Sequence, residues 1–156
     1  MANSPEEVAL ELSRAALESQ DGSENQLREK ATAVLAAASI VVPVAAVALG
    51  SAPAIAAIPF SVAAMAYFWC ARSCVVALFP KDREAGLLGG EMLQLAIETE
   101  ADLPQMQASA ASYLDGFYKH NQVILEGAAD KVREALISLG VEIVALAVAL
   151  VVTILD

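Results

Sequence analysis

The chain has 156 residues, 58% of them hydrophobic, and a formal net charge of −10. A chain this short and apolar is not typical of a soluble enzyme. The acidic balance excludes a broad basic face for binding duplex nucleic acid, so the composition predicts one small membrane domain with modest soluble extensions.

Residues 1–30 are predicted to form cytoplasmic N-terminal helices. Ser4-Pro5-Glu6-Glu7 has the residues of a capped helix start, with proline at the first helical position. This helix is expected to end near Ser19, because Gln20-Asp21-Gly22 is typical of a break. Ser23 then opens a second helix that runs into the membrane.

Residues 31–79 are apolar except for one charge, Arg72. The length suits two bilayer-spanning helices, and Gly50-Ser51-Ala52-Pro53 marks the turn between them. We therefore expect a transmembrane helical hairpin. Its first span is Ala31–Leu49, with a proline kink at Pro43 that is either structural or a hinge.

The second span has two possible ends. A span from Ala54 to Ala71 places Arg72 at the water side as an ordinary anchor, with aromatic residues forming an interfacial belt. A span from Ile58 to Phe79 buries Arg72 in the bilayer. Because the residues from Ser73 to Phe79 are also apolar, the longer span remains an alternative.

Residues 80–134 are expected to be a cytoplasmic helical region, with a short acidic helix over Glu91–Leu103 that Pro104 ends. One long helix follows and continues into a third transmembrane span, residues 135–156, which contains Glu142. Apolar and small residues recur at steps of three and four, which indicates a packed coiled-coil seam; its positions are Met106, Ala110, Leu114, Phe117, Asn121, Ile124, Ala128, Val132 and Ala135.

The distribution of Lys and Arg predicts the topology. All nine fall on one side if the N-terminus is cytoplasmic and three spans follow, and the turn around Gly50 has none. The protein is therefore expected to be a multi-pass membrane protein with a cytoplasmic N-terminus and its C-terminus on the far side. Alanine-rich faces permit close helix contact; they include Ala36, Ala37, Ala45, Ala46, Ala145 and Ala149.

Arg72 and Glu142 are the candidate pore or intramembrane charges, because ionisable residues inside a bilayer are costly. On the longer second span they lie at the same depth, eight residues from Pro80 and from Glu134 respectively. One hypothesis is therefore a static ion pair within or between subunits, or two snorkelling side chains. The alternative is a ring of Glu142 carboxylates that selects cations around a symmetry axis.

Asn121 is the candidate residue for setting oligomer register, since a polar residue at a seam position fixes register at some cost in stability. The alternative is that it faces water at the edge of the seam. The aromatic group around Phe117 is expected to be packing rather than a ligand pocket; it comprises Tyr113, Phe117, Tyr118 and His120. Cys70 and Cys74 are expected to be small apolar packing residues.

The sequence offers no catalytic constellation, phosphate-binding loop or metal-ligand cluster. We therefore expect a protein that is not an enzyme, with no metal and no cofactor. The acidic residues before Pro104 are interpreted as a solvated helix face.

The layout resembles the small membrane effectors of nucleotide-signalled antiphage systems, the SLATT-type proteins and the effectors of Pycsar, CBASS and Hailong systems. The resemblance rests on Arg28-Glu29-Lys30 before the hairpin, Leu78-Phe79-Pro80 after it, and Lys119-His120-Asn121 through Lys131-Val132-Arg133 before the last span. This sequence lacks the recognisable nucleotide-sensing domain of better-defined members. A ligand site would therefore have to be built from the basic residues of the cytoplasmic helices: Lys119, His120, Lys131 and Arg133.

The resemblance implies a homo-oligomeric ion channel or pore of the bacterial inner (cytoplasmic) membrane that disrupts membrane potential during antiphage defence. Its expected partners are the lipid bilayer, further copies of the chain, and a nucleotide second messenger or the enzyme that synthesises it. The alternative is a non-conducting membrane scaffold or an accessory subunit of a larger membrane complex.

Overall fold

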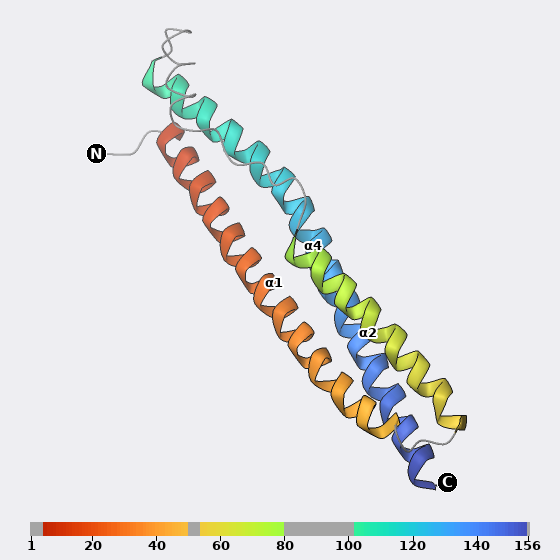
Figure 1. The fold of residues 1–156 in the computed structure, drawn as a ribbon. Helices are drawn as coiled ribbons and strands as arrows, with labels where there is room; N and C mark the ends of the chain where they lie inside the picture. The colour runs from red at the N-terminus through yellow and green to blue at the C-terminus, as the bar shows by residue number, and fades with distance from the viewer. Residues whose placement is uncertain (1–4, 50–53, 80–101, 156) are drawn as a thin grey trace. The chain divides into compact units, whose positions relative to one another are not determined.

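The computed structural model describes residues 5–49, 54–79 and 102–155, apart from the side chains of residues 5–6 and 43–49 (Figure 1). Every regular element in these ranges is helical. They are α1 (Pro5–Leu49), a 3-10 turn η1 (Ala54–Ala56), α2 (Ala57–Leu78) and α4 (Leu103–Leu155). The all-α prediction is confirmed.

Two of the described helical segments, Ala54–Leu78 and Leu103–Leu155, are long and apolar enough to cross a membrane by length and composition. In each segment the most apolar stretch of 18 residues is mostly exposed: 22% of it is buried in Ala54–Leu78 and 28% in Leu103–Leu155. Most of that apolar surface is therefore uncovered in one chain, unlike the core helix of a soluble protein. The first predicted span belongs to α1, which is not one of the two, so the three-span layout stays a prediction.

The predicted break after Ser19 is wrong, because α1 is continuous from Pro5 to Leu49. A β-carbon at Gly22 would meet nothing within 4 Å, so this glycine lies on an open face of the helix. It costs about 1 kcal/mol relative to alanine, which packing elsewhere on the helix offsets. The Ser23 hydroxyl donates to the Ser19 carbonyl at 3.0 Å, four residues back within the same helix, instead of capping a new one.

The start of α4 also differs from the prediction. Asp102 was expected to lie on an acidic helix that Pro104 ends, but Pro104 lies in the first turn of α4. The backbone N–H of Gln105 donates to Oδ1 of Asp102 at 3.0 Å, so Asp102 caps this helix. The sequence Asp102-Leu103-Pro104-Gln105 is thus typical of the start of a helix. Proline is tolerated in the first turn because the backbone N–H groups there have no partner within the helix. The rest of the predicted Glu91–Leu103 helix lies outside the described residues.

The long helix with a packed seam is confirmed. All nine predicted seam positions are buried or half-buried. Helix α1 has a matching pattern: its buried and half-buried positions include a series at alternating steps of three and four, at Leu10, Ser13, Leu17, Gln20, Glu24, Leu27, Ala31, Val34, Ala38 and Val41. A three-four alternation is the pattern of coiled-coil contact, so each helix buries one continuous stripe.

The chain divides into two compact units. Unit 1 combines residues 1–25 with 81–126, and unit 2 combines residues 26–80 with 127–156. In unit 1, Nε2 of Gln20 on α1 donates to the backbone carbonyl of Tyr118 on α4 at 2.8 Å, which joins the two helices at this level.

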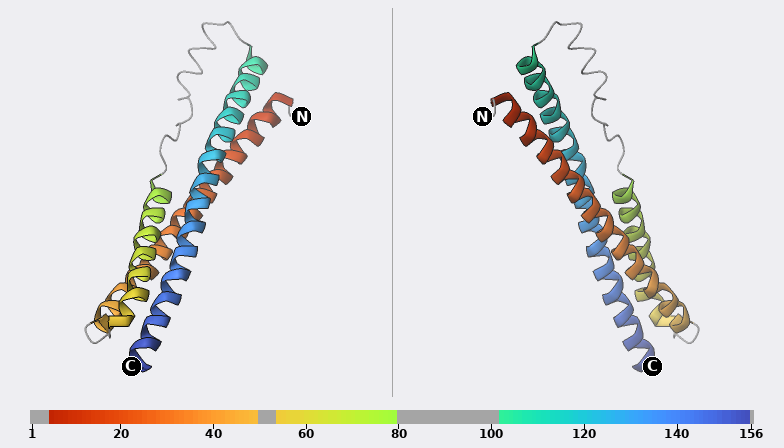
Figure 2. Two further views of the ribbon diagram at one scale, coloured as in Figure 1. Left: turned by 90° about the vertical axis from the view of Figure 1, so that its right-hand side faces the viewer. Right: turned by 90° about the vertical axis from the view of Figure 1, so that its left-hand side faces the viewer.

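Unit 2 is a bundle of three helical segments, in which α2 runs antiparallel to α1 and α4 (Figure 2). Three stacked clusters form its core. The first contains Ala31, Ala77 and Val132, the second Val34, Cys70 and Ala135, and the third Phe60, Ala145 and Leu146.

Alanine is the most frequent residue of these clusters, which allows the helices to approach closely. Of the small faces predicted for contact, Ala145 and Ala149 are buried. Ala36 and Ala37 are exposed in one chain, because they lie beside the buried stripe of α1 rather than on it. Ala45 and Ala46 lie outside the described side chains.

Candidate functional site

Glu142 is the largest of the described side chains that are almost fully buried, at 2% exposed. Ala135, Leu139, Glu142 and Leu146 follow one another along α4 at steps of three and four, so they share one face of the helix. That face packs into the bundle of unit 2, and Glu142 lies there with its apolar neighbours. Its Oε2 has no hydrogen-bond partner among the described atoms. A carboxyl group in this position is costly, which makes it the strongest candidate for function.

The described surroundings of Glu142 contain no opposite charge. On α2, the fully buried thiols of Cys70 and Cys74 hydrogen-bond to each other, and Cys70 lies within electrostatic range of Glu142. On α1, the stripe from Ala31 to Val41 carries no ionisable group. The two cysteines are free thiols in the bundle core, as their predicted packing role requires.

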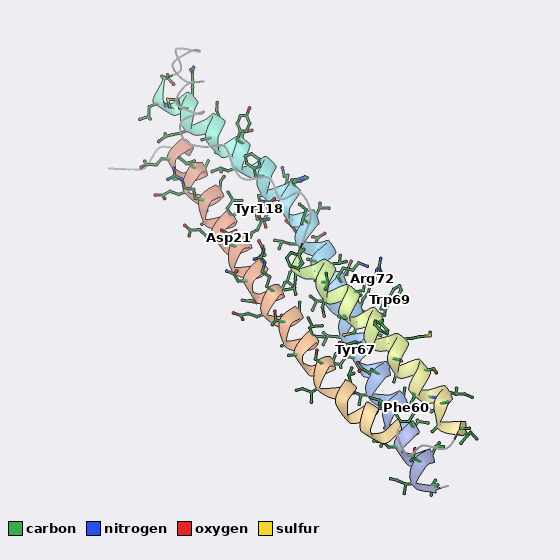
Figure 3. The ribbon with its side chains drawn as sticks, in the orientation of Figure 1. Asp21, Phe60, Tyr67, Trp69, Arg72 and Tyr118 are labelled. Atoms are coloured by element: carbon green, nitrogen blue, oxygen red, sulfur yellow. The ribbon has the colours of Figure 1, made fainter. Side chains whose placement is uncertain are left out.

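Arg72 does not pair with Glu142 within one chain. No ion pair joins them in the described part of the structure; instead the Arg72 guanidinium carbon lies 5.5 Å from the centre of the Trp69 ring, and the side chain is exposed (Figure 3). The Ser73 hydroxyl lies 3.5 Å from Oε2 of Glu134. Arg72 is therefore level with Glu134, about 12 Å along α4 from Glu142.

This difference has a geometric cause. The predicted equal depth assumes that the spans of Arg72 and Glu142 end at one level, at Pro80 and at Glu134. In the structure, the last turn of α2 extends past the level of Glu134 and packs through Ala77 against Val132 and Ala31. The prediction that Arg72 and Glu142 share one depth is wrong within the chain; a pair between subunits stays a prediction.

Glu134 is the centre of a charged cluster at this level. Lys131 Nζ lies 2.7 Å and 2.8 Å from its two carboxylate oxygens. This hydrogen bond is the main cause that lowers the pKa of Glu134 below its ordinary value, and the charges of Lys131 and Arg72 lower it further. This cluster of Arg72, Lys131 and Glu134 therefore has two positive charges and one negative charge.

The four cations predicted to meet a nucleotide phosphate do not form one site within either unit. Lys119 and His120 belong to unit 1, while Lys131 and Arg133 belong to unit 2. Both lysines already have carboxylate partners on their own helix: Lys119 Nζ lies 2.6 Å from Asp115 Oδ2, and Lys131 is held by Glu134. His120 and Arg133 are exposed.

Asn121 is 5% exposed, so the alternative that it faces water at a seam edge is wrong for the described chain. It lies one helical turn after Tyr118, whose carbonyl accepts the bond from Gln20. Gln20 and Glu24 are buried on α1 in the same unit. A buried polar layer therefore exists within one chain, and sequence reasoning missed its α1 half because Gln20 was assigned to a break.

The aromatic group of unit 1 is only partly brought together. An open hollow of about 410 Å³ is lined, among the described residues, by Ser112, Tyr113, Gly116 and Phe117. Neither Tyr118 nor His120 belongs to that described lining. No group of three or more His, Cys, Asp or Glu side chains able to hold a metal occurs in the described ranges.

Comparison of the chain with protein-family models, with curated proteins and with solved structures finds no match.

Proposed function

We propose that the protein is an oligomeric membrane effector that forms or gates an ion-conducting pore and so disrupts membrane potential. The observation that supports this most is Glu142, 2% exposed in an apolar three-helix bundle with one carboxyl oxygen unpaired. Ionisable groups in membrane helices are rare and commonly mark ion paths. The protein acts without enzymatic chemistry in this proposal.

The proposed placement in the bilayer follows from the level of Arg72 and Glu134. With both at the cytoplasmic interface, η1 and α2 together cross from Ala54 to Ala71, α4 crosses from Ala135 to Leu155, and the span Ala31–Leu49 of α1 is the third crossing. Each segment is close to the about 20 residues that a bilayer requires. The N-terminus is then cytoplasmic, Trp69 lies at the interface, and Glu142 lies about two turns inside.

Glu142 must change its surroundings for ions to pass it. In a single chain it is enclosed by helices of its own unit, so we propose that conduction requires a rearrangement that turns α4 and brings Glu142 from several subunits to a shared axis. A ring of carboxylates there favours cations. The enclosed arrangement corresponds to the non-conducting state.

The proposed trigger is a nucleotide second messenger of an antiphage system, made by a cognate enzyme. Two features support this trigger: the order of helices along the chain, and the exposure of two basic residues, His120 and Arg133. Cyclic mono- and dinucleotides are the ligands to test, by comparing flux with and without each of them.

Ion flux from vesicles tests the proposal. The purified chain should release a cation gradient under at least one nucleotide, and Glu142→Gln should change the ratio of cation to anion permeability. Glu126→Gln is the matched control, because Glu126 is exposed and, among the described residues, its carboxylate accepts a hydrogen bond from Gln122 on the same helix. Conductance whose selectivity is identical in Glu142→Gln would contradict the role of Glu142.

A non-conducting membrane scaffold is the second candidate. The observation that favours it is the same enclosure, since Glu142 is only 2% exposed among the described residues of its unit. A protein that forms homogeneous oligomers but passes no ions with any nucleotide would support the scaffold. An accessory subunit would instead co-purify with an obligate partner.

A further inference from the structure

Trp69 and Arg72 form a polar and aromatic pair on an otherwise apolar outer face of α2 (Figure 3). Trp69 is 53% exposed, and its neighbour Phe68 is 71% exposed. The guanidinium lies 5.5 Å from the indole centre, within the range of a cation–π contact. Arg72 is therefore held at the outer surface of unit 2, where an external ligand can reach it.

A second cation lies at the same level. Lys131 on α4 is bound to Glu134, which the Ser73 hydroxyl approaches at 3.5 Å. Arg72 is close enough to act electrostatically on the same carboxylate. Because Glu134 neutralises only one of the two cations, the cluster keeps a net positive charge on the described residues and can attract an anion.

Large apolar side chains are exposed on both helices from this cluster toward Ala54 and Leu155, and also beyond Arg72, at Val75, Val76 and Phe79. On α2, Met65 and Phe68 are each 71% exposed, and on α4, Ile137 and Val144 are 60% and 64% exposed. A ligand that satisfies both regions has an anionic head and a hydrocarbon tail. Free phosphate or a nucleotide satisfies only the cationic part.

We propose that Arg72, with Trp69 and Lys131, is a binding site for the phosphate headgroup of an anionic phospholipid. The phosphate accepts hydrogen bonds from the Arg72 guanidinium, the indole lies at the headgroup level, and the acyl chains cover the exposed face of α2. This inference rests on the proposed membrane embedding and is independent of whether the protein conducts ions.

The single tryptophan of the chain is the reporter for the test. The full chain is reconstituted in vesicles in which either phosphatidylglycerol or phosphatidylcholine carries brominated acyl chains, and the quenching of Trp69 fluorescence by each lipid is compared. A basic side chain near an anionic surface contributes about 1 kcal/mol, so brominated phosphatidylglycerol should associate about fivefold more strongly. Arg72→Gln should reduce this preference toward equality, and Arg72→Lys should keep most of it.

Lys119→Gln is the control variant, because Lys119 is exposed and paired with Asp115 in the other unit, and it should leave the preference unchanged. Equal quenching by both lipids in the native chain would overturn the inference alone. No quenching by either lipid would overturn the membrane embedding beneath it. A preference removed by excess inorganic phosphate would assign the site to free phosphate instead of a headgroup.

Discussion

The hydroxyl of Ser73 on α2 lies 3.5 Å from Oε2 of Glu134 on α4, and this contact defines how the two helices are aligned along their axes. It makes Arg72 and Glu134 level with each other and leaves Glu142 about two turns further along α4, among apolar side chains. Arg72 is thus a surface cation at the charged level, while Glu142 is an unpaired group in the core.

Crosslinking can test this alignment. In a background with Cys70→Ala and Cys74→Ala, the pair Ser73→Cys and Glu134→Cys should react efficiently with a short thiol crosslinker within one chain, as judged by gel mobility. Ser73→Cys with Val141→Cys is the matched control and should react poorly, because Val141 lies about two turns further along α4. Equal efficiency for the two pairs would contradict the alignment.

Gly22→Ala should stabilise the protein by about 0.5–1 kcal/mol, because an added β-carbon meets nothing within 4 Å and alanine favours the helix. Thermal unfolding in detergent, followed by circular dichroism, measures this. Gly22→Pro should destabilise it strongly, since α1 is continuous here. If both variants were neutral, residues 20–22 would be a break after all.

The polar layer of unit 1 leads to opposite expectations for Asn121 and Gln20. Asn121→Leu should raise thermal stability, since the buried Oδ1 of Asn121 has no partner among the described atoms and an unpaired buried acceptor costs about 1–3 kcal/mol. It should also make the oligomer less homogeneous, if the layer sets register. Gln20→Ala should lower stability by about 1 kcal/mol through loss of the bond to Tyr118.

Melting curves and light scattering on the same detergent samples separate these two effects. A stabilised Asn121→Leu variant with an unchanged oligomer would show that the layer fixes α1 on α4 within one chain and has no part in assembly. A destabilised variant would mean that Asn121 has a partner that satisfies its amide.

Glu134 should make the stability of the protein depend on acid pH. Its pKa is lowered in the folded state, chiefly by the hydrogen bond from Lys131, so its contribution is complete above the ordinary carboxyl pKa and is lost as pH falls through the lowered value. Lys131→Gln should weaken this dependence. Unfolding measured across the acid range in both chains checks it, and identical pH profiles would contradict the pairing.

Much of the architecture is determined by the sequence alone. Apolar length and the three-four spacing from Met106 to Ala135 predict an all-helical chain with one very long helix, because such periodicity can be buried only on a helix face. The same spacing places Asn121 at a seam position but leaves open whether it faces water, and the sequence alone identifies Glu142 as a charge in an apolar segment.

Only the tertiary structure decides what those residues meet. Whether Arg72 lies opposite Glu134 or Glu142 depends on how far α2 extends past the end of the apolar segment of α4, which is a matter of packing between residues distant in sequence. The continuity of α1 through Gly22 has the same origin. A local breaker costs about 1 kcal/mol, and a continuous buried stripe along the helix outweighs it.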